Sequence, residues 1–351
     1  MLLERARLDP VTAIERLAGM QAQYPPAPYI GLWSRLQDFR REDLESAIKG
    51  DRVLKATLMR ATLHLVSART FSAYRLVAPD PYTVYTNTAR LLRQHGLDPA
   101  AARRRVRERV LAVVRKRPVS RAELGAIVRE ETGDGVPLPN PAGWGAAAAY
   151  GDLISVVDDA LFVFPREAHH RLAPPAAVEK SEALRRVAEW YLAAFGPASR
   201  ADLAQWSGQT STVFAVAFDV LDLVTFEADD GRTLFDLRAA PRPDPDVEAP
   251  VRFLPRWDNL LLAHDRRQRV LPDAYRQMII RNGMMFQTFL VDGLVAGAWE
   301  APLRGKAALT LRPMRKLSAL ERAEVEEEGI RLLSWLRPDT ERRDLRWEIE
   351  A

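Results

Sequence analysis

The chain repeats one short string of residues, and this repeat is the strongest constraint on how it folds. Pro118–Leu124 (PVSRAEL) recurs as Pro197–Leu203 (PASRADL). In each copy a serine is followed three residues later by a carboxylate, which is the pattern of a capping box at the start of a helix. A string that recurs with the same local role is typical of a duplicated structural unit. The sequence therefore predicts two related units.

The residues around each copy follow the same order of elements. Apolar residues at helical spacing precede each copy, and a further helix and two short strands follow it. The strand pairs are expected at 154–157 with 161–164 and at 224–227 with 233–237. Helix, capped helix, helix and hairpin is the order of a winged helix.

A third and fainter copy is expected at the N-terminus. It lacks the repeated string, but it has helical patterns at 11–17 and 42–49 and strand patterns at 53–59 and 61–66. Three tandem winged-helix motifs are therefore expected.

The C-terminal part of the chain has a different character. Asn282-Gly283 and Asp292-Gly293 each lie between apolar runs, which is the strongest short-range signal for a β-hairpin. We expect an antiparallel, β-barrel-like region there, a closing helix at 319–336 and a proline-rich linker at 239–250. The predicted fold class is α+β. Its expected segments are 1–98 with the first winged helix, 99–175 with the second, 176–240 with the third, and 251–351.

The residue types present exclude several classes of protein. The chain has no cysteine, which excludes disulfides, thiolate nucleophiles and cysteine-based metal sites. Its five histidines show no metal-binding spacing, so we expect no metal and no cofactor. No apolar run approaches the roughly 20 residues that span a bilayer, so we expect a cytoplasmic protein without a membrane partner.

Arginine clusters indicate a nucleic-acid partner. The net charge is only +4, but the excess is carried by arginine, whose guanidinium makes bidentate contacts with phosphate. The candidate DNA-binding residues are Arg103, Arg104, Arg107, Arg115, Lys116, Arg117, Arg266 and Arg267. The alternative for the first six is a solvated helix face, and for the last two it is surface ion pairing.

Two glutamines near the N-terminus, Gln21 and Gln23, are the best local candidates for chemistry. Residues two apart project to the same side of an extended segment but diverge by about 200° on a helix. Pro25-Pro26 disfavours helix in the residue before it, so we expect a helix to end here and both amides to emerge at its terminus. The alternative is a helix end with two solvated glutamines.

Four stretches of the chain together resemble one family. They are Met20–Gln23 (MQAQ), Thr57–Val66 (TLMRATLHLV), Leu254–Leu262 (LPRWDNLLL) and Phe289–Trp299 (FLVDGLVAGAW). These stretches resemble the winged-helix DNA glycosylases of the AlkZ and YcaQ type, and Gln23 places the chain nearer the AlkZ-like branch because the other branch has aspartate there. The resemblance implies three tandem winged helices that form a concave basic channel, with a C-terminal β-barrel-like part. It assigns catalysis to Gln21 and Gln23. It also implies more residues ahead of the first helix than this chain has.

The expected activity is that of a monofunctional DNA glycosylase that removes bulky or cross-linking N7-alkylpurines. Such an enzyme serves DNA repair or self-resistance to alkylating natural products, and we expect it to act as a monomer on double-stranded DNA that contains alkylated purines. The alternatives are a non-catalytic tandem winged-helix DNA-binding protein, such as a transcriptional regulator, and an inert relative that only binds damaged DNA.

Three further residues are secondary candidates for the site. His64 lies on a predicted strand, Asp258 follows Trp257 in one of the resembling stretches, and Tyr24 follows the glutamines. The alternatives are a core histidine, a structural turn or buried hydrogen bond, and simple packing, respectively.

Overall fold

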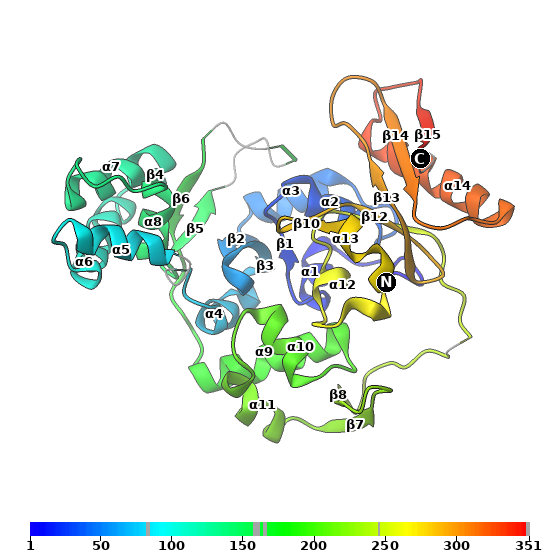
Figure 1. The fold of residues 1–351 in the computed structure, drawn as a ribbon, viewed down its shortest axis with the longest axis horizontal. Coiled ribbons are helices and arrows are strands. Elements are labelled where there is room, and N and C mark those ends of the chain that lie inside the picture. The colour runs from blue at the N-terminus through cyan, green and yellow to red at the C-terminus, as the bar shows by residue number, and fades with distance from the viewer. Residues whose placement is uncertain (82–84, 157–161, 164–166, 245, 349–351) are drawn as a thin grey trace.

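The computed structural model has a mixed α+β fold. It describes residues 1–351 apart from 82–84, 157–161, 164–166, 245 and 349–351. Figure 1 shows the N-terminal elements at the centre, a lobe of α5 to α8 on one side, α9 to α11 below, and the C-terminal sheet with α14 on the other side.

The N-terminal segment alternates helices and short strands. The elements are α1 (Pro10–Arg16), β1 (Met20–Gln21), α2 (Pro26–Trp33), α3 (Arg41–Lys49), β2 (Val53–Thr57), β3 (Leu63–Ser67) and α4 (Ala68–Val77). Helix α1 begins after Asp9, whose carboxylate accepts hydrogen bonds from the first free amides of the helix. The helices and the strand pair predicted between residues 11 and 66 are confirmed.

The next segment contains the first copy of the repeated string. Its elements are α5 (Thr86–Gln94), α6 (Pro99–Val114), β4 (Val119–Ser120), α7 (Arg121–Thr132), α8 (Pro141–Ala148), β5 (Leu153–Val156) and β6 (His169–Leu172). Ser120 and Glu123 form the predicted capping box at the start of α7. The partner of β5 is β6; of the partner predicted at 161–164, residues 161 and 164 lie outside the described residues, and 162 and 163 are in a turn and a bend rather than a strand.

The second copy of the string is surrounded by equivalent elements. They are α9 (Lys180–Phe195), α10 (Arg200–Ser207), α11 (Ala215–Val220), β7 (Leu223–Glu227) and β8 (Thr233–Leu237). Ser199 and Asp202 form the capping box of α10. The residue before each capping serine also pairs with a following strand, Val119 with His170 and Ala198 with Phe235. The repeat in sequence is therefore also a repeat in structure.

The strand pairs of the first two segments form one continuous sheet. Its order is β1-β3-β2-β5-β6-β4, and the junction is the pairing of Lys55 with Ser155. Leu92 of α5, inside the first predicted segment, packs in the core built by α6, α7 and α8. Both the β-sheet and the hydrophobic core therefore extend across the predicted boundary between these two segments.

The C-terminal sheet has open edges. Its elements are β9 (Arg252–Leu254), α12 (Asn259–Leu262), α13 (Arg276–Ile279), β10 (Ile280–Arg281), β11 (Met284–Met285), β12 (Thr288–Val291), β13 (Leu294–Glu300), β14 (Ala308–Pro313), α14 (Ala319–Leu336) and β15 (Asp344–Trp347). Both predicted hairpins, β10–β11 and β12–β13, are confirmed.

The expected barrel-like closure of this region is wrong. The sheet order is β15-β14-β13-β12-β9, and β14 and β15 run parallel. A parallel neighbour requires a crossover, which helix α14 makes across the sheet. The sheet buries its face under α14, so it does not need to close on itself.

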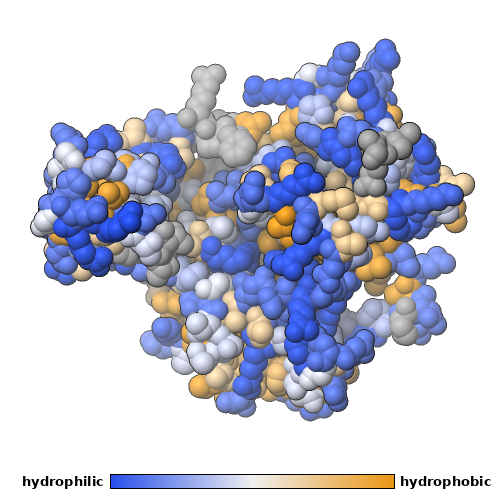
Figure 2. All heavy atoms as spheres, viewed as in Figure 1, coloured by the Kyte–Doolittle hydropathy of each residue, from blue (hydrophilic) through white to orange (hydrophobic). Residues whose placement is uncertain are grey.

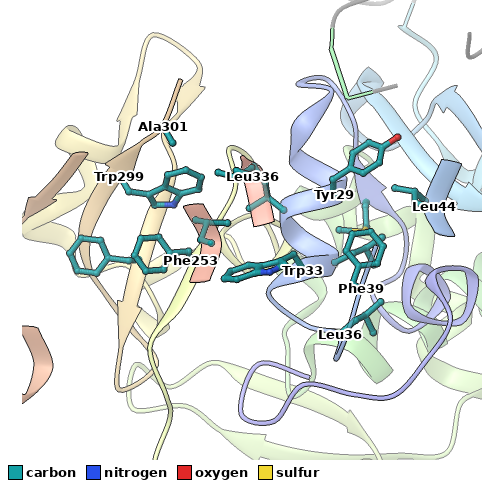
Figure 3. Close-up of a cluster of buried hydrophobic side chains, with 14 of the residues drawn as sticks. Tyr29, Trp33, Leu36, Phe39, Leu44, Phe253, Trp299, Ala301 and Leu336 are labelled. Carbon is teal, nitrogen blue, oxygen red and sulfur yellow. The ribbon is translucent and has the colours of Figure 1, made fainter. Parts of the chain in front are cut away.

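The largest core joins the two ends of the chain. The rings of Trp33 and Phe39, in the N-terminal segment, pack against the ring of Trp335 on α14, with centroid distances of 6.1 and 6.0 Å. Figure 3 shows Trp33 between Leu336 and Phe253 on one side and Leu36 and Phe39 on the other. The N-terminal segment, which carries Gln21, is therefore fixed against the C-terminal sheet.

The outer surface is largely hydrophilic on the face shown in Figure 2, including the lobe of α5 to α8. Within the part of the chain that the structure describes, none of the helices combines the length and the apolar character needed to cross a bilayer.

Candidate active site

Gln21 lies in a short strand and Gln23 in a bend two residues later, and neither lies at the end of a helix. Gln21 is in β1, where it pairs with His64 of β3, and the amide of Ala22 donates to the carbonyl of Leu63 at 2.7 Å. Pro25 and Pro26 begin helix α2, since proline is well suited to the first turn of a helix. The expected helix terminus is therefore wrong: α1 ends at Arg16, and strand β1 and the bend after it hold Gln21 and Gln23 beside β3.

Gln21 is buried and held by one arginine. Its side chain is 7% exposed, and Oε1 accepts a hydrogen bond from Nη2 of Arg60 at 3.0 Å. Arginine has only donors, so the atom facing it is the amide oxygen and the NH2 group lies on the opposite branch of the amide.

His64, the cross-strand partner of Gln21, is buried and neutral. Its Nδ1 donates to the carbonyl of Thr62 at 2.9 Å, which leaves Nε2 as the acceptor that faces Nη2 of Arg60 at 3.3 Å. Burial, with the nearby Arg60 charge, lowers the pKa of His64 to about 3. His64 is therefore uncharged at neutral pH and is not a general acid.

Arg60 is the cation of this cluster. Burial, with the charge of Arg267, lowers the pKa of Arg60 to about 10, so its guanidinium stays protonated at neutral pH. No carboxylate among the described residues forms an ion pair with it; its other hydrogen bond, from Nη1, goes to the carbonyl of Trp206. The site is therefore positively charged, with amide and imidazole groups as the neighbours of the charge.

Sequence reasoning did not identify Arg60 as a site residue. It lies in the turn between β2 and β3, at a left-handed φ of 54°. An arginine in a turn between two strands is normally expected to be exposed to solvent. The position of Arg60 in the sequence therefore did not indicate that it is buried. The only indication was its place within the stretch TLMRATLHLV.

Gln23 and Tyr24 lie at the exposed edge of the cluster. Gln23 is exposed, and its Oε1 accepts from the amide of Leu63 at 3.3 Å. Tyr24 is half-buried under the guanidinium of Arg256, which lies 5.0 Å from the ring centroid, and burial raises the pKa of its hydroxyl. Arg256 also lines a pocket of about 390 Å³ together with Phe286 and other residues of the C-terminal sheet.

The contacts of Asp258 are with groups that hold the fold together. Its two oxygens accept from both terminal nitrogens of the buried Arg35, at 2.7 and 2.9 Å, and one of them also caps helix α12 through the amide of Leu260. The next residue, Asn259, donates to the carbonyls of Leu17 and Gly19, just before the glutamines. The Trp257–Asn259 stretch therefore holds the segment that leads into the site, and Asp258 has no contact with Gln21.

The predicted basic residues fall into two places. Arg267 is near the site, because it is the charge that acts on Arg60, and its Nε donates to the carbonyl of Leu261 at 2.9 Å. Arg266 instead pairs with Asp230 at 2.5 Å. The other six residues lie on or just after α6, in the lobe that Figure 1 shows apart from α12.

Carboxylates neutralise the charge of three of the six basic residues on or just after α6. Arg103 pairs with Asp80 at 2.8 Å, Arg107 with Asp152 at 2.7 Å and Arg117 with Glu123 at 2.5 Å. The remaining residues are exposed and form no ion pair with any residue that the structure describes. They are Arg104, Arg115 and Lys116.

Metal ligation has no support in the described residues, among which no cluster of three or more histidine or acidic side chains could hold an ion.

One comparison with known proteins identifies a family. The model of the family described as DNA glycosylase AlkZ-like matches residues 14–335. No curated protein sequence matches the chain. Among solved structures, the DNA glycosylase AlkZ of Streptomyces sahachiroi is similar in fold, with a TM-score of 0.79 and 20% identity over 99% of this chain and 95% of that chain. Because the family model spans nearly the whole sequence, this chain belongs to the AlkZ-like family of DNA glycosylases.

Proposed function

We propose that this DNA glycosylase hydrolyses the N-glycosidic bond of bulky or cross-linking N7-alkylpurines, with Gln21 and Gln23 as its catalytic residues. The observation that carries the proposal is the charge of the site. Gln21 and a neutral His64 both contact the protonated Arg60, and Asp258, the acidic candidate of the sequence, is fully engaged by Arg35.

Such a site suits a base that already carries a positive charge. Alkylation at N7 makes the purine a good leaving group, so no general acid is needed. The C1′–N9 bond breaks, its electron pair neutralises the departing base, and water adds to C1′ and loses a proton to solvent. Fixed amide dipoles in a site of low water content orient that water and favour the oxocarbenium-like sugar.

The product of this reaction is an abasic site. No lysine is placed against Gln21 among the described contacts, so a Schiff base and strand cleavage by the enzyme are not expected. We propose three winged-helix units that hold double-stranded DNA: the repeated capping boxes and hairpins support those at 99–175 and 176–240, and the helices and the β2–β3 pair support the one at 1–98. We also propose that the enzyme acts as a monomer and that exposed arginines on α6 contact phosphates.

Base release from a duplex with one N7-alkylguanine tests the proposal. Wild type is expected to release the base and leave an abasic site. Gln21→Ala and Gln23→Ala are each expected to lower the single-turnover rate, by about 100-fold for Gln21, because a preorganised amide contact is lost. Gln94→Ala, at an exposed position of helix α5, is the matched control and should keep the wild-type rate. Wild-type rates in both site variants, or no release by wild type, would contradict the proposal.

A further inference from the structure

The turn between β2 and β3 brings Arg60 against three different parts of the chain. Its Nη2 donates to Gln21 Oε1 at 3.0 Å and lies 3.3 Å from His64 Nε2, while Nη1 donates to the carbonyl of Trp206 at the end of α10. One planar guanidinium therefore joins β1, β3 and α10.

The backbone of Arg60 is also held in place. Arg60 is in the left-handed region at φ 54°, and Gly208, just after α10, approaches so closely that an added Cβ would lie 2.8 Å from the Cα of Arg60. Gly208 has φ +81° and ends helix α10. With both the backbone and the guanidinium fixed, the direction of each N–H of Arg60 is fixed as well.

We propose that Arg60 is a positioning residue, which orients and polarises the amide of Gln21 for catalysis. This inference rests on the proposed function, because it assigns Arg60 a task within the same reaction. A guanidinium on Oε1 fixes which branch of the amide is oxygen and which is NH2, and it leaves the NH2 group and the second lone pair of Oε1 for a water. A charged donor on the oxygen also strengthens the NH2 as a donor.

His64 gives the guanidinium a second acceptor. Because Nδ1 of His64 is bound to the Thr62 carbonyl, Nε2 presents a lone pair to the same Nη2 atom that contacts Gln21. The two acceptors together define the plane of the arginine. Lysine has one ammonium on a flexible stem and cannot reproduce this planar arrangement.

A double-mutant cycle tests this role. Single-turnover base release from N7-alkylguanine DNA is measured for wild type, Arg60→Met, Gln21→Ala and the double variant, with the rate constant and the half-saturating enzyme concentration determined separately. Arg60→Met is expected to lower the rate constant by about 10- to 100-fold with the half-saturating concentration unchanged, because the amide is misplaced. The double variant should be no slower than Gln21→Ala alone, since Arg60 acts through Gln21.

Arg60→Lys is the second variant, and it keeps the charge if the methionine variant fails to fold. It should also be slow at saturating enzyme, with a thermal midpoint close to that of wild type. Multiplicative losses in the double variant, a change in half-saturation alone, or a wild-type rate for Arg60→Lys would overturn the positioning role. No release by wild type is a different result, because it would overturn the proposed function and this role with it.

Discussion

At the scale of single residues, burial decides which groups of the site carry charge. His64 is 2% exposed beside the Arg60 guanidinium, and its pKa is lowered to about 3, whereas an exposed histidine titrates near about 6.5. The imidazole is therefore an acceptor and never a cation while the protein is folded at neutral pH. Among the described residues, the positive charge that contacts Gln21 is that of Arg60.

This difference predicts how stability depends on pH. Below about pH 6.5, His64 is protonated in the unfolded chain but not in the folded chain. The contribution of His64 to the free energy of unfolding is therefore complete above that pH and is lost as pH falls toward 3. Wild type should lose up to about 1.4 kcal/mol per pH unit more than His64→Gln, whose side chain does not titrate. Urea unfolding at pH 7, 6 and 5 measures the two slopes. His170 also has a lowered pKa, but it contributes equally to both proteins. Equal slopes would contradict the assignment.

The sequence predicts Gln21 and Gln23 as candidate catalytic residues but not Arg60, which binds Gln21. The resembling stretches single out the two glutamines, whereas their spacing alone does not, and Gln21 lies in a strand where a helix terminus was expected. Arg60 was missed because its burial depends on α10, a helix almost 150 residues further along the chain. Patterns among neighbouring residues do not predict a contact between residues so far apart in the sequence.

At the scale of elements, local signals were sufficient wherever the chain folds back on itself at short range. The capping boxes at Ser120 and Ser199 each satisfy free amides within four residues, and the turns at Asn282-Gly283 and Asp292-Gly293 join adjacent strands. Each of these features depends on residues close in sequence, and each was predicted from them.

Pairings between distant elements were not accessible in this way. The continuous six-stranded sheet depends on the contact of Lys55 with Ser155, and the open C-terminal sheet depends on β15 returning beside β14 after helix α14. The sequence of an edge strand does not indicate which strand will pair with it. The alternation of apolar and polar residues shows only which face of a strand is buried. The barrel expectation failed for this reason.

At the scale of the whole molecule, a buried ion pair links the N-terminal segment to the C-terminal part of the chain. Arg35, at the end of α2, and Asp258, at the start of α12, have side chains 2% and 1% exposed and are 223 residues apart. Together with the shared core around Trp33 and Trp335, this pair fixes the N-terminal segment that carries the glutamines.

Breaking the pair should be costly. Asp258→Ala leaves the guanidinium of Arg35 buried without a counter-charge, so the free energy of unfolding is expected to fall by about 3 to 5 kcal/mol. Asp222→Ala is the matched control, because it removes the carboxylate of the exposed Asp222–Arg238 pair and should cost less than about 1 kcal/mol. Chemical denaturation of both variants gives the comparison, and similar losses in the two would argue against a structural role for Asp258.

The central claim is that two uncharged amides suffice because the substrate base is already cationic. The most direct measurement compares release of an N7-alkylguanine with release of its 7-deaza analogue, which keeps the substituent and the glycosidic bond but has no charge, in the same duplex. The rate enhancement over spontaneous loss is measured for each, together with the affinity for each duplex. We predict a large enhancement for the cationic base and none for the neutral analogue at similar affinity. No enhancement for the cationic base, or a comparable enhancement for the neutral one, would contradict the account.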